Sequence, residues 1–341
     1  MELALYCPLC GYYEKKEDTP GRQGDFYTSV SVGRLFGELL AFQFAGWLAA
    51  EGGSQKAEAR VIEAGAHDGR LAKDILNWLK LQRPELFGAM EYWIVEPSVQ
   101  RQVWQSETLP EFGGKVRWVA DLKSIAPRSI CGVIFSNELL DSLPVHRLGW
   151  DAKQGEWFEW GVTVKDDRFV WVPLPKPFHA AGFTVHVPPE LLAVLPDGFT
   201  TEISPAAGNW WREAAGRLER GKLLTLDYGL TAEDFFAPNR ASGTLRAYRQ
   251  HRVSDDVLAN AGEQDLTTHV NFTAIQSVGE AAGLRTDALV TQAQFLTGIA
   301  QGAWHEDGGG GAWTKDHTRQ FQTLTHPEHL GRAFRVLIQS R

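Results

Sequence analysis

The sequence predicts an α/β fold in which a mostly parallel, Rossmann-like sheet is interrupted by an inserted β-rich region. The first observation is a short apolar run, 61–62, which ends in an acid and leads through a glycine turn into apolar residues at helical spacing over 71–79. The second is that acidic residues also follow the next apolar runs. Because the carboxyl ends of parallel strands meet at one edge of a sheet, this order predicts one site there.

The remaining elements follow the same pattern along the chain. Strands are expected at 60–63, 92–96, 116–119, 130–136, 222–227, 284–290 and 333–338. Helices are expected at 35–50, 71–79, 206–219 and 272–282, and from Ser98 and Thr291. A strand or an extended loop is expected at 243–251, and the four glycines 308–311 predict a flexible linker.

Four segments organise the chain. An N-terminal arm, 1–30, is expected to pack on the body through its tyrosines, and the first part of the sheet domain spans 31–144. The inserted cap, 145–203, contains two β-rich runs separated by a charged turn, which is typical of an antiparallel hairpin. The second part of the sheet domain, 204–341, is expected to carry loops on the substrate side.

Composition excludes several classes of protein. The 341 residues carry a formal net charge of −8 without a basic run, which argues against a nucleic-acid partner. The longest apolar segment, 35–50, is too short to span a bilayer, and no secretory leader is evident, so a cytoplasmic location without membrane insertion is expected. Cys7 and Cys10 form a C-x-x-C, but no partner cluster follows at zinc spacing, so no metal is expected.

The glycine turn after the first strand indicates the ligand. It reads E-x-G-x-x-x-G through Glu63, Gly65 and Gly69, which differs from the G-x-G-x-x-G turn that binds a dinucleotide. Glu63 and Asp68 would repel a pyrophosphate, whereas they suit the sulfonium and ammonium groups of S-adenosylmethionine. That cofactor is therefore the prediction, with NAD or a purely structural turn as the alternatives.

Further candidate donor contacts lie after the other strands. Glu96 ends the second strand and could bond both ribose hydroxyls, although it could also cap a surface helix. Asp121 follows the third strand, where it could accept a bond from the adenine amino group. The predicted donor-binding residues are Asp25, Thr28, Glu63, Gly65, Ala66, Gly69, Glu96, Asp121, Leu122 and Asn137.

Motifs along nearly the whole chain resemble one family. These are G-D-F-Y-T-S at 24–29, E-A-G at 63–65, V-E-P-S at 95–98, N-E-L-L-D at 137–141, D-Y-G at 227–229 and G-E-Q-D-L-T at 262–267. In this order they resemble the MidA-like methyltransferases, whose mitochondrial member is a complex I assembly factor that dimethylates a protein arginine. The resemblance implies a class I S-adenosylmethionine-dependent methyltransferase fold, with a mostly parallel seven-stranded sheet and an inserted substrate-side region.

An arginine acceptor would need carboxylates, because its guanidinium is protonated at all ordinary pH values. Glu138 and Asp141 follow the fourth strand, beside the expected position of the methyl group, and are the predicted catalytic pair. The alternative is an acid pair that complements a helix dipole. His269 could polarise or clamp the acceptor, although a lone histidine is more often a structural hydrogen-bonding group.

Three functions remain open at this point. The first is a protein-arginine methyltransferase acting on a subunit of respiratory complex I, as the resemblance implies. The second is a methyltransferase for a small molecule or another protein side chain. The third is a cofactor-binding assembly factor with little turnover. The sequence does not indicate the oligomeric state.

Overall fold

The computed structural model describes residues 1–15, 28–51, 59–177, 185, 187–249, 252–305 and 313–341. Asp25 and the glycine run 308–311 lie outside these ranges. Within them, no helix is long and apolar enough to cross a bilayer. No group of three or more His, Cys, Asp or Glu side chains in the same ranges could hold a metal ion.

The central sheet carries the fold. Its strands, in spatial order, are β14 (Arg285–Thr291), β15 (Phe334–Ser340), β9 (Leu218–Leu230), β4 (Ile130–Asn137), β1 (Arg60–Ala64), β2 (Glu91–Val95) and β3 (Val116–Val119). A short eighth strand, β13 (Val270–Asn271), pairs with the end of β9. Among these strands, β15 alone runs in the opposite direction to its two neighbours, β14 and β9. The sheet is therefore mostly parallel, as the sequence predicted.

Alternate residues of each strand feed two apolar cores, one on each face of the sheet. Val61 of β1 and Phe135 of β4 belong to one core, whereas Ile62 and Ile134 belong to the other. Successive side chains of a strand point to opposite faces, so a sheet covered on both sides needs apolar residues at nearly every position. This explains the continuous apolar runs that the sequence shows.

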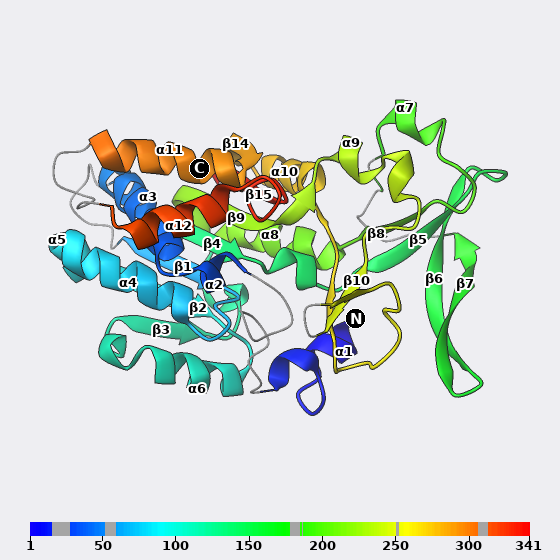
Figure 1. Cartoon of the computed structure of the whole chain (residues 1–341), viewed down its shortest axis with the longest axis horizontal. Coiled ribbons are helices and arrows are strands. Elements are labelled where there is room, and N and C mark those ends of the chain that lie inside the picture. The colour runs from blue at the N-terminus through cyan, green and yellow to red at the C-terminus, as the bar shows by residue number, and fades with distance from the viewer. Residues whose placement is uncertain (16–27, 52–58, 178–184, 186, 250–251, 306–312) are drawn as a thin grey trace.

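Helices cover both faces (Figure 1). The first core includes residues of α3 (Leu35–Glu51), α4 (Arg70–Gln82), α11 (Gln292–His305) and α12 (Lys315–Thr325). The second core includes α8 (Pro205–Arg217) and α10 (Phe272–Ala281). The shorter helices are α2 (Ser29–Val32), α5 (Pro84–Ala89), α6 (Val99–Thr108), α7 (Pro189–Leu192) and α9 (Ala232–Phe235).

Two glycines allow the central strands to pair. A Cβ added to Gly132 of β4, where φ is +149°, would lie 2.0 Å from the carbonyl oxygen of Arg60 in β1. A Cβ on Gly221 of β9 would lie 1.9 Å from the carbonyl oxygen of Gly132. No side chain fits at these distances, so both positions require glycine for β1, β4 and β9 to lie at hydrogen-bonding separation.

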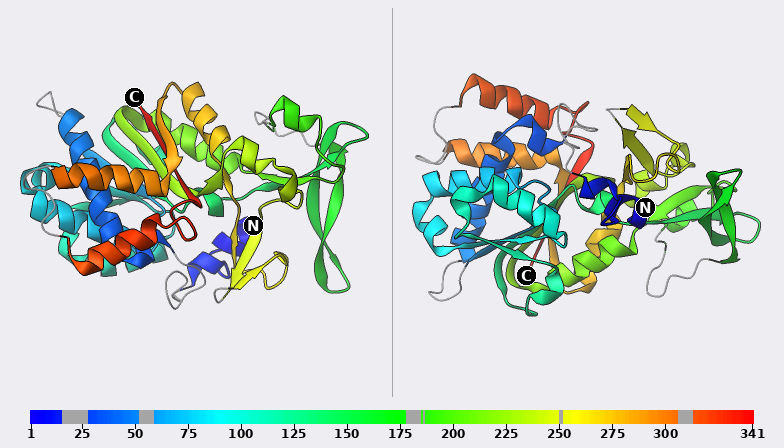
Figure 2. Two further views of the ribbon diagram at one scale, coloured as in Figure 1. Left: turned by 45° about the horizontal axis from the view of Figure 1, so that its top comes forward. Right: turned by 90° about the horizontal axis from the view of Figure 1, so that it is seen from below.

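Two smaller sheets flank the large one. The first, of four strands, comprises β5 (His146–Asp151), β6 (Glu156–Lys165), β7 (Arg168–Pro177) and β8 (Thr200–Ile203), and its β6–β7 hairpin extends away from the central sheet in Figure 2. The second comprises β10 (Arg246–Arg249), β11 (Arg252–Ser254) and β12 (Asp265–Thr267). The N-terminal segment, α1 (Glu2–Tyr6) and the 3-10 turn η1 (Tyr12–Glu14), packs on this second sheet.

Candidate active site

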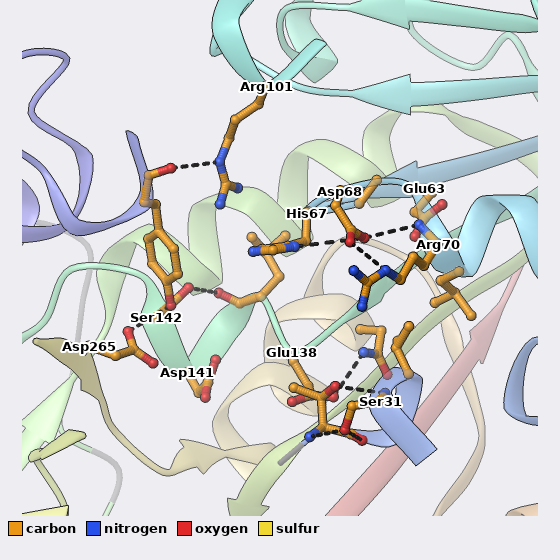
Figure 3. A pocket seen from close by; sticks show the side chains of 18 of the residues that line it. Ser31, Glu63, His67, Asp68, Arg70, Arg101, Glu138, Asp141, Ser142 and Asp265 are labelled. Carbon is orange, nitrogen blue, oxygen red and sulfur yellow. Dashed lines mark hydrogen bonds and ion pairs between the residues drawn. The ribbon is translucent and has the colours of Figure 1, made fainter. Parts of the chain in front are cut away.

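A cavity lies at the carboxyl ends of β1 and β4, where the order of the strands along the sheet reverses. Figure 3 shows Glu63, Asp68 and Arg70 on one side of this cavity and Asp141 and Asp265 on the other. Open parallel sheets bind their ligands at such a switch point, because the two adjacent turns leave in opposite directions and open a crevice. We call this cavity the switch-point cavity.

The turn after β1 approaches the cavity through its backbone. Gly65 and Gly69 have φ values of +75° and +85°, a region that side chains disfavour. A Cβ on Gly65 would also lie 3.1 Å from a methyl carbon of Leu139, in the turn after β4. The two turns therefore touch at Gly65. Gly69 caps the start of α4, so the amino end of that helix follows directly after the turn.

The charge of this turn differs from the interpretation of the sequence. The carboxyl of Glu63 is buried and accepts a 2.6 Å hydrogen bond from the Tyr92 hydroxyl, and burial raises the pKa of Glu63 to about 7 despite this bond. Asp68 pairs with Arg70, with an Nε to Oδ2 distance of 2.8 Å. At neutral pH the Glu63 carboxyl is therefore only partly ionised, and Arg70 balances the charge of Asp68. The turn presents less negative charge to the cavity than two free acids would give.

Glu138 lies in the turn after β4, at the boundary between the two sides of the cavity. Its backbone has a φ of +52°, which is uncommon for a residue with a side chain. Its Oε1 accepts hydrogen bonds from the Ser29 amide at 3.2 Å and the Asn137 Nδ2 at 3.1 Å. Burial raises the pKa of Glu138 to about 8, the Asn137 bond opposes this rise, and the charge of Asp227 adds to it.

Asp227, in β9, holds this turn in place. Its Oδ2 accepts hydrogen bonds from the amides of Leu139 at 3.1 Å and Leu140 at 2.8 Å, and its Oδ1 accepts one from the Tyr228 amide at 2.8 Å. These bonds fix the 3-10 turn η4 (Leu140–Ser142), which carries Asp141. Burial and the nearby charge of Asp227 raise the pKa of Asp141 well above its ordinary value.

A third acid, Asp265 of β12, completes the acidic side of the cavity. Tyr13 donates a 2.8 Å hydrogen bond from its hydroxyl to Oδ1 of Asp265. The Tyr6 hydroxyl lies 2.9 Å from Oγ of Ser142. Arg101, from α6, also lines the cavity and donates a 3.0 Å bond from Nε to the carbonyl oxygen of Tyr13. The acidic side thus combines segments from both ends of the chain.

The structure brings seven of the predicted site residues together. Those that line the switch-point cavity are Thr28, Glu63, Gly65, Ala66, Asn137, Glu138 and Asp141. Thr28 caps the start of α2: its side chain accepts a bond from the Ser31 amide, and the Ser31 side chain accepts one from the Thr28 amide. The sequence interpretation did not predict this cap. The sequence interpretation did not identify Tyr6, Tyr13 or Arg101 as site residues, because tyrosines in an N-terminal arm and an arginine in a helix are ordinary packing and surface residues.

Five predicted residues lie outside the lining of this cavity. Gly69 caps α4, Asp121 is exposed and accepts a bond from the Ser124 amide, and Leu122 is buried in the second core. Glu96 is buried and accepts bonds from the Ser98 amide and the Gln105 amide group. His269 lines a different cavity of about 360 Å³, and burial lowers its pKa to about 3.

One buried acceptor atom is compatible with the ammonium group of the predicted donor. The Oδ1 atom of Asn137 has no hydrogen-bond partner within the described ranges, and Asn137 is only 8% exposed. An unsatisfied buried acceptor costs about 1–3 kcal/mol. An ammonium group, such as that of S-adenosylmethionine, would supply the missing donor.

The fold and the position of this cavity define a class of protein, the class I S-adenosylmethionine-dependent methyltransferases. Residues 39–290 match the family described as "Putative S-adenosyl-L-methionine-dependent methyltransferase", and the chain belongs to that family. The predictions of fold, enzyme class and cofactor are therefore confirmed.

Individual relatives agree with this assignment. A crystal structure of a protein from Burkholderia thailandensis with bound S-adenosyl-homocysteine superposes with a TM-score of 0.82 at 31% identity, covering 100% of this chain and 86% of that one. The Drosophila melanogaster protein named protein arginine methyltransferase NDUFAF7 homolog, mitochondrial, is 27% identical, covering 99% of this chain and 79% of the relative. Mouse NDUFAF7, with the same activity in its name, is 28% identical, and the match spans 65% of its length.

The predicted cytoplasmic location is wrong by this comparison. The relatives from fly, mouse and human are all named as mitochondrial proteins. The prediction depended on the lack of an apolar secretory leader. Mitochondrial targeting uses amphipathic, arginine-rich segments instead, so the lack of an apolar leader does not distinguish the two compartments.

Proposed function

We propose that this methyltransferase transfers methyl groups to the guanidinium of a protein arginine. The observation that carries the proposal is the set of three acids, Glu138, Asp141 and Asp265, that line the switch-point cavity beside the glycine turn. The names of the curated relatives support the same acceptor. The resemblance to the MidA-like methyltransferases further suggests a subunit of respiratory complex I as the protein substrate.

The acids suit a guanidinium for an electrostatic reason. Asp265 is buried and the other two residues are half-buried. Burial of their carboxyls raises the pKa values of Glu138 and Asp141, so at neutral pH these two acids keep part of their protons until a cation binds. A permanently charged guanidinium would favour the ionised acids and displace those protons. Charge-assisted bonds from a planar guanidinium to two carboxylates also fix its orientation, which a compact ammonium cannot match.

The protein then contributes alignment and proton transfer. S-adenosylmethionine supplies a methyl on a sulfonium, and the acceptor nitrogen takes that methyl in line as the carbon–sulfur bond breaks. Glu138 lies at the boundary of the two sides, so its carboxylate can orient one guanidinium nitrogen toward the donor. The acceptor nitrogen must lose one proton overall, and an ionised Glu138 or Asp141 can accept it.

The proposal is tested by product analysis. The purified protein is incubated with methyl-labelled S-adenosylmethionine and a protein extract that includes complex I subunits, and the labelled protein is hydrolysed to amino acids. Label in methylarginine is the expected result. Label in methyl-lysine or in a small molecule would contradict the proposal.

A matched pair of variants separates catalysis from binding. Glu138→Gln keeps the size of the side chain and removes the charge, so we expect at least a 100-fold loss of methyl transfer with unchanged affinity for S-adenosylhomocysteine. Glu219→Gln, at the far end of β9 from the cavity, is the control and should retain full activity. Full methylation by Glu138→Gln would contradict this role of Glu138, whereas full biological activity of a Glu138→Ala variant that no longer methylates would favour a cofactor-binding assembly factor.

A further inference from the structure

The N-terminal segment, residues 1–15, forms one wall of the switch-point cavity. Leu5 and Tyr12 of this segment are buried in an apolar cluster with Leu245 and Ala247 of the β10 region and Leu266 of β12. Lys15 donates a 2.7 Å bond from Nζ to the carbonyl oxygen of Gly262. The segment is therefore fixed against the small sheet that carries Asp265.

Two tyrosines of this segment reach the cavity on its acidic side. The rings of Tyr6 and Tyr13 lie 5.5 Å apart between centroids and are tilted by 35°. Their hydroxyls bond Ser142 and Asp265, on two separate elements, η4 and β12. Both phenols have pKa values raised by burial, so they stay neutral donors at working pH. The two rings thus connect the N-terminal segment to the turn that carries Asp141.

The structure itself places a guanidinium against one of these rings. The Cζ atom of Arg101 lies 5.1 Å from the centroid of the Tyr13 ring. Aromatic faces attract cations, and arginine stacks on them more often than lysine does. The Tyr13 environment therefore already accommodates the chemical group that an arginine acceptor carries.

We propose that Tyr6, Tyr13 and Asp265 form the acceptor subsite, so that the N-terminal segment helps to select a cationic, planar acceptor side chain and takes no part in donor binding. This inference rests on the proposed function, because it assigns residues to the arginine acceptor. In this arrangement the donor would lie on the opposite side of the cavity, at Gly65, Ala66 and Asn137, which also line it. The two groups of residues meet at Glu138, where methyl transfer would occur.

The test measures the two ligands separately by titration calorimetry. The probes are S-adenosylhomocysteine and, with that product bound, an arginine-containing peptide and the same peptide with neutral citrulline in place of arginine. The variants are Tyr13→Leu, which removes the ring, and Asp265→Asn, which removes the charge. Tyr12→Phe, in the same segment but outside the cavity lining, is the control.

We expect wild type and Tyr12→Phe to bind the arginine peptide at least 10-fold more tightly than the citrulline peptide. In Tyr13→Leu and Asp265→Asn this preference should fall below threefold, with the affinity for S-adenosylhomocysteine within twofold of wild type. A preserved preference, or a 10-fold loss of S-adenosylhomocysteine affinity in either variant, would overturn the subsite. If wild type itself shows no preference for arginine, the proposed function fails and the subsite fails with it.

Discussion

Asp227→Asn is the substitution with the most specific expected consequences. The carboxylate of Asp227 is completely buried and touches no ligand-binding surface, yet it accepts the amide bonds that hold Leu139 and Leu140 in the turn after β4. An asparagine can present only one oxygen. The other position becomes an NH2 group, which cannot accept a bond from an amide.

The magnitude follows from these bonds. Burial raises the pKa of Asp227 to about 7, so its carboxyl is mostly ionised only above neutral pH. A hydrogen bond to a charged group contributes roughly 1.5–3 kcal/mol, so losing the ionised carboxylate weakens the turn by about 3 kcal/mol after the relief of burying a charge is subtracted. If the looser turn misaligns Glu138 and Asp141 and the transition state loses this free energy of stabilisation, kcat/KM falls by about 100-fold. Asp227 makes no hydrogen bond to the donor turn after β1, so S-adenosylhomocysteine should bind within threefold of wild type.

A second consequence distinguishes alignment from general damage. The pKa of Glu138 is raised to about 8 by burial and, in addition, by the charge of Asp227. Below this value Glu138 is mostly protonated in the free enzyme and cannot hold a cation, so kcat/KM should rise with pH, with a midpoint near pH 8. Removing the charge of Asp227 makes Glu138 easier to ionise, so the midpoint should move to lower pH in the variant.

The assay is methyl transfer to an arginine peptide between pH 6 and 9, for wild type, Asp227→Asn and Asp287→Asn. Asp287 is a carboxylate on β14 that bonds Lys222 and Arg285, far along the sheet from the cavity, so its variant should keep the wild-type midpoint. An unshifted midpoint in Asp227→Asn, or activity within threefold of wild type, would refute this role for Asp227.

Three further predictions use stability and binding. Gly132→Ala should lower the melting temperature by 10 °C or more, since its Cβ would collide with the backbone of Arg60, whereas Gly46→Ala, with open space around the added methyl, should be neutral or stabilising. Tyr92→Phe removes the bond that favours ionised Glu63, so S-adenosylhomocysteine should bind several-fold more weakly at pH 7 and equally well at pH 9; a pH-independent loss would exclude this reason. Between pH 5 and 8 the folded chain keeps protons on Glu63 and Glu138 that the unfolded chain releases. These two groups should therefore make the free energy of unfolding, measured in urea, fall as the pH rises. The variant Glu138→Gln should show a smaller fall.

The sequence predicted the features that depend on near neighbours. The β1 turn is local, since Gly65 and Gly69 follow directly after an apolar strand, and their positive φ values agree with their role. The parallel sheet was predictable for the same reason, because short apolar runs such as Tyr92–Val95 of β2 and Val133–Phe135 of β4 recur along the chain.

The features that depend on distant partners were not predictable. The hydrogen bond from Tyr92 to Glu63 joins residues that are 29 positions apart in the sequence, and the bond from Tyr13 to Asp265 joins residues that are 252 positions apart. The sequence suggested that Asp227 shapes the acceptor pocket, but it did not predict that Asp227 holds the turn after β4, because its partners are backbone amides that have no signature in the sequence. His269 shows the reverse case, since its loop is polar in sequence but its ring packs 4.2 Å from Tyr228 and faces another cavity.

A crystal structure of the protein with S-adenosylhomocysteine and an arginine-containing peptide tests the central claim most directly. The expected result is the sulfur of the product beside the β1 turn, with the guanidinium facing it and held at about 2.7–2.9 Å by the carboxylates of Glu138 and Asp141. A guanidinium bound away from these acids, or a product molecule bound outside the switch-point cavity, would contradict the account.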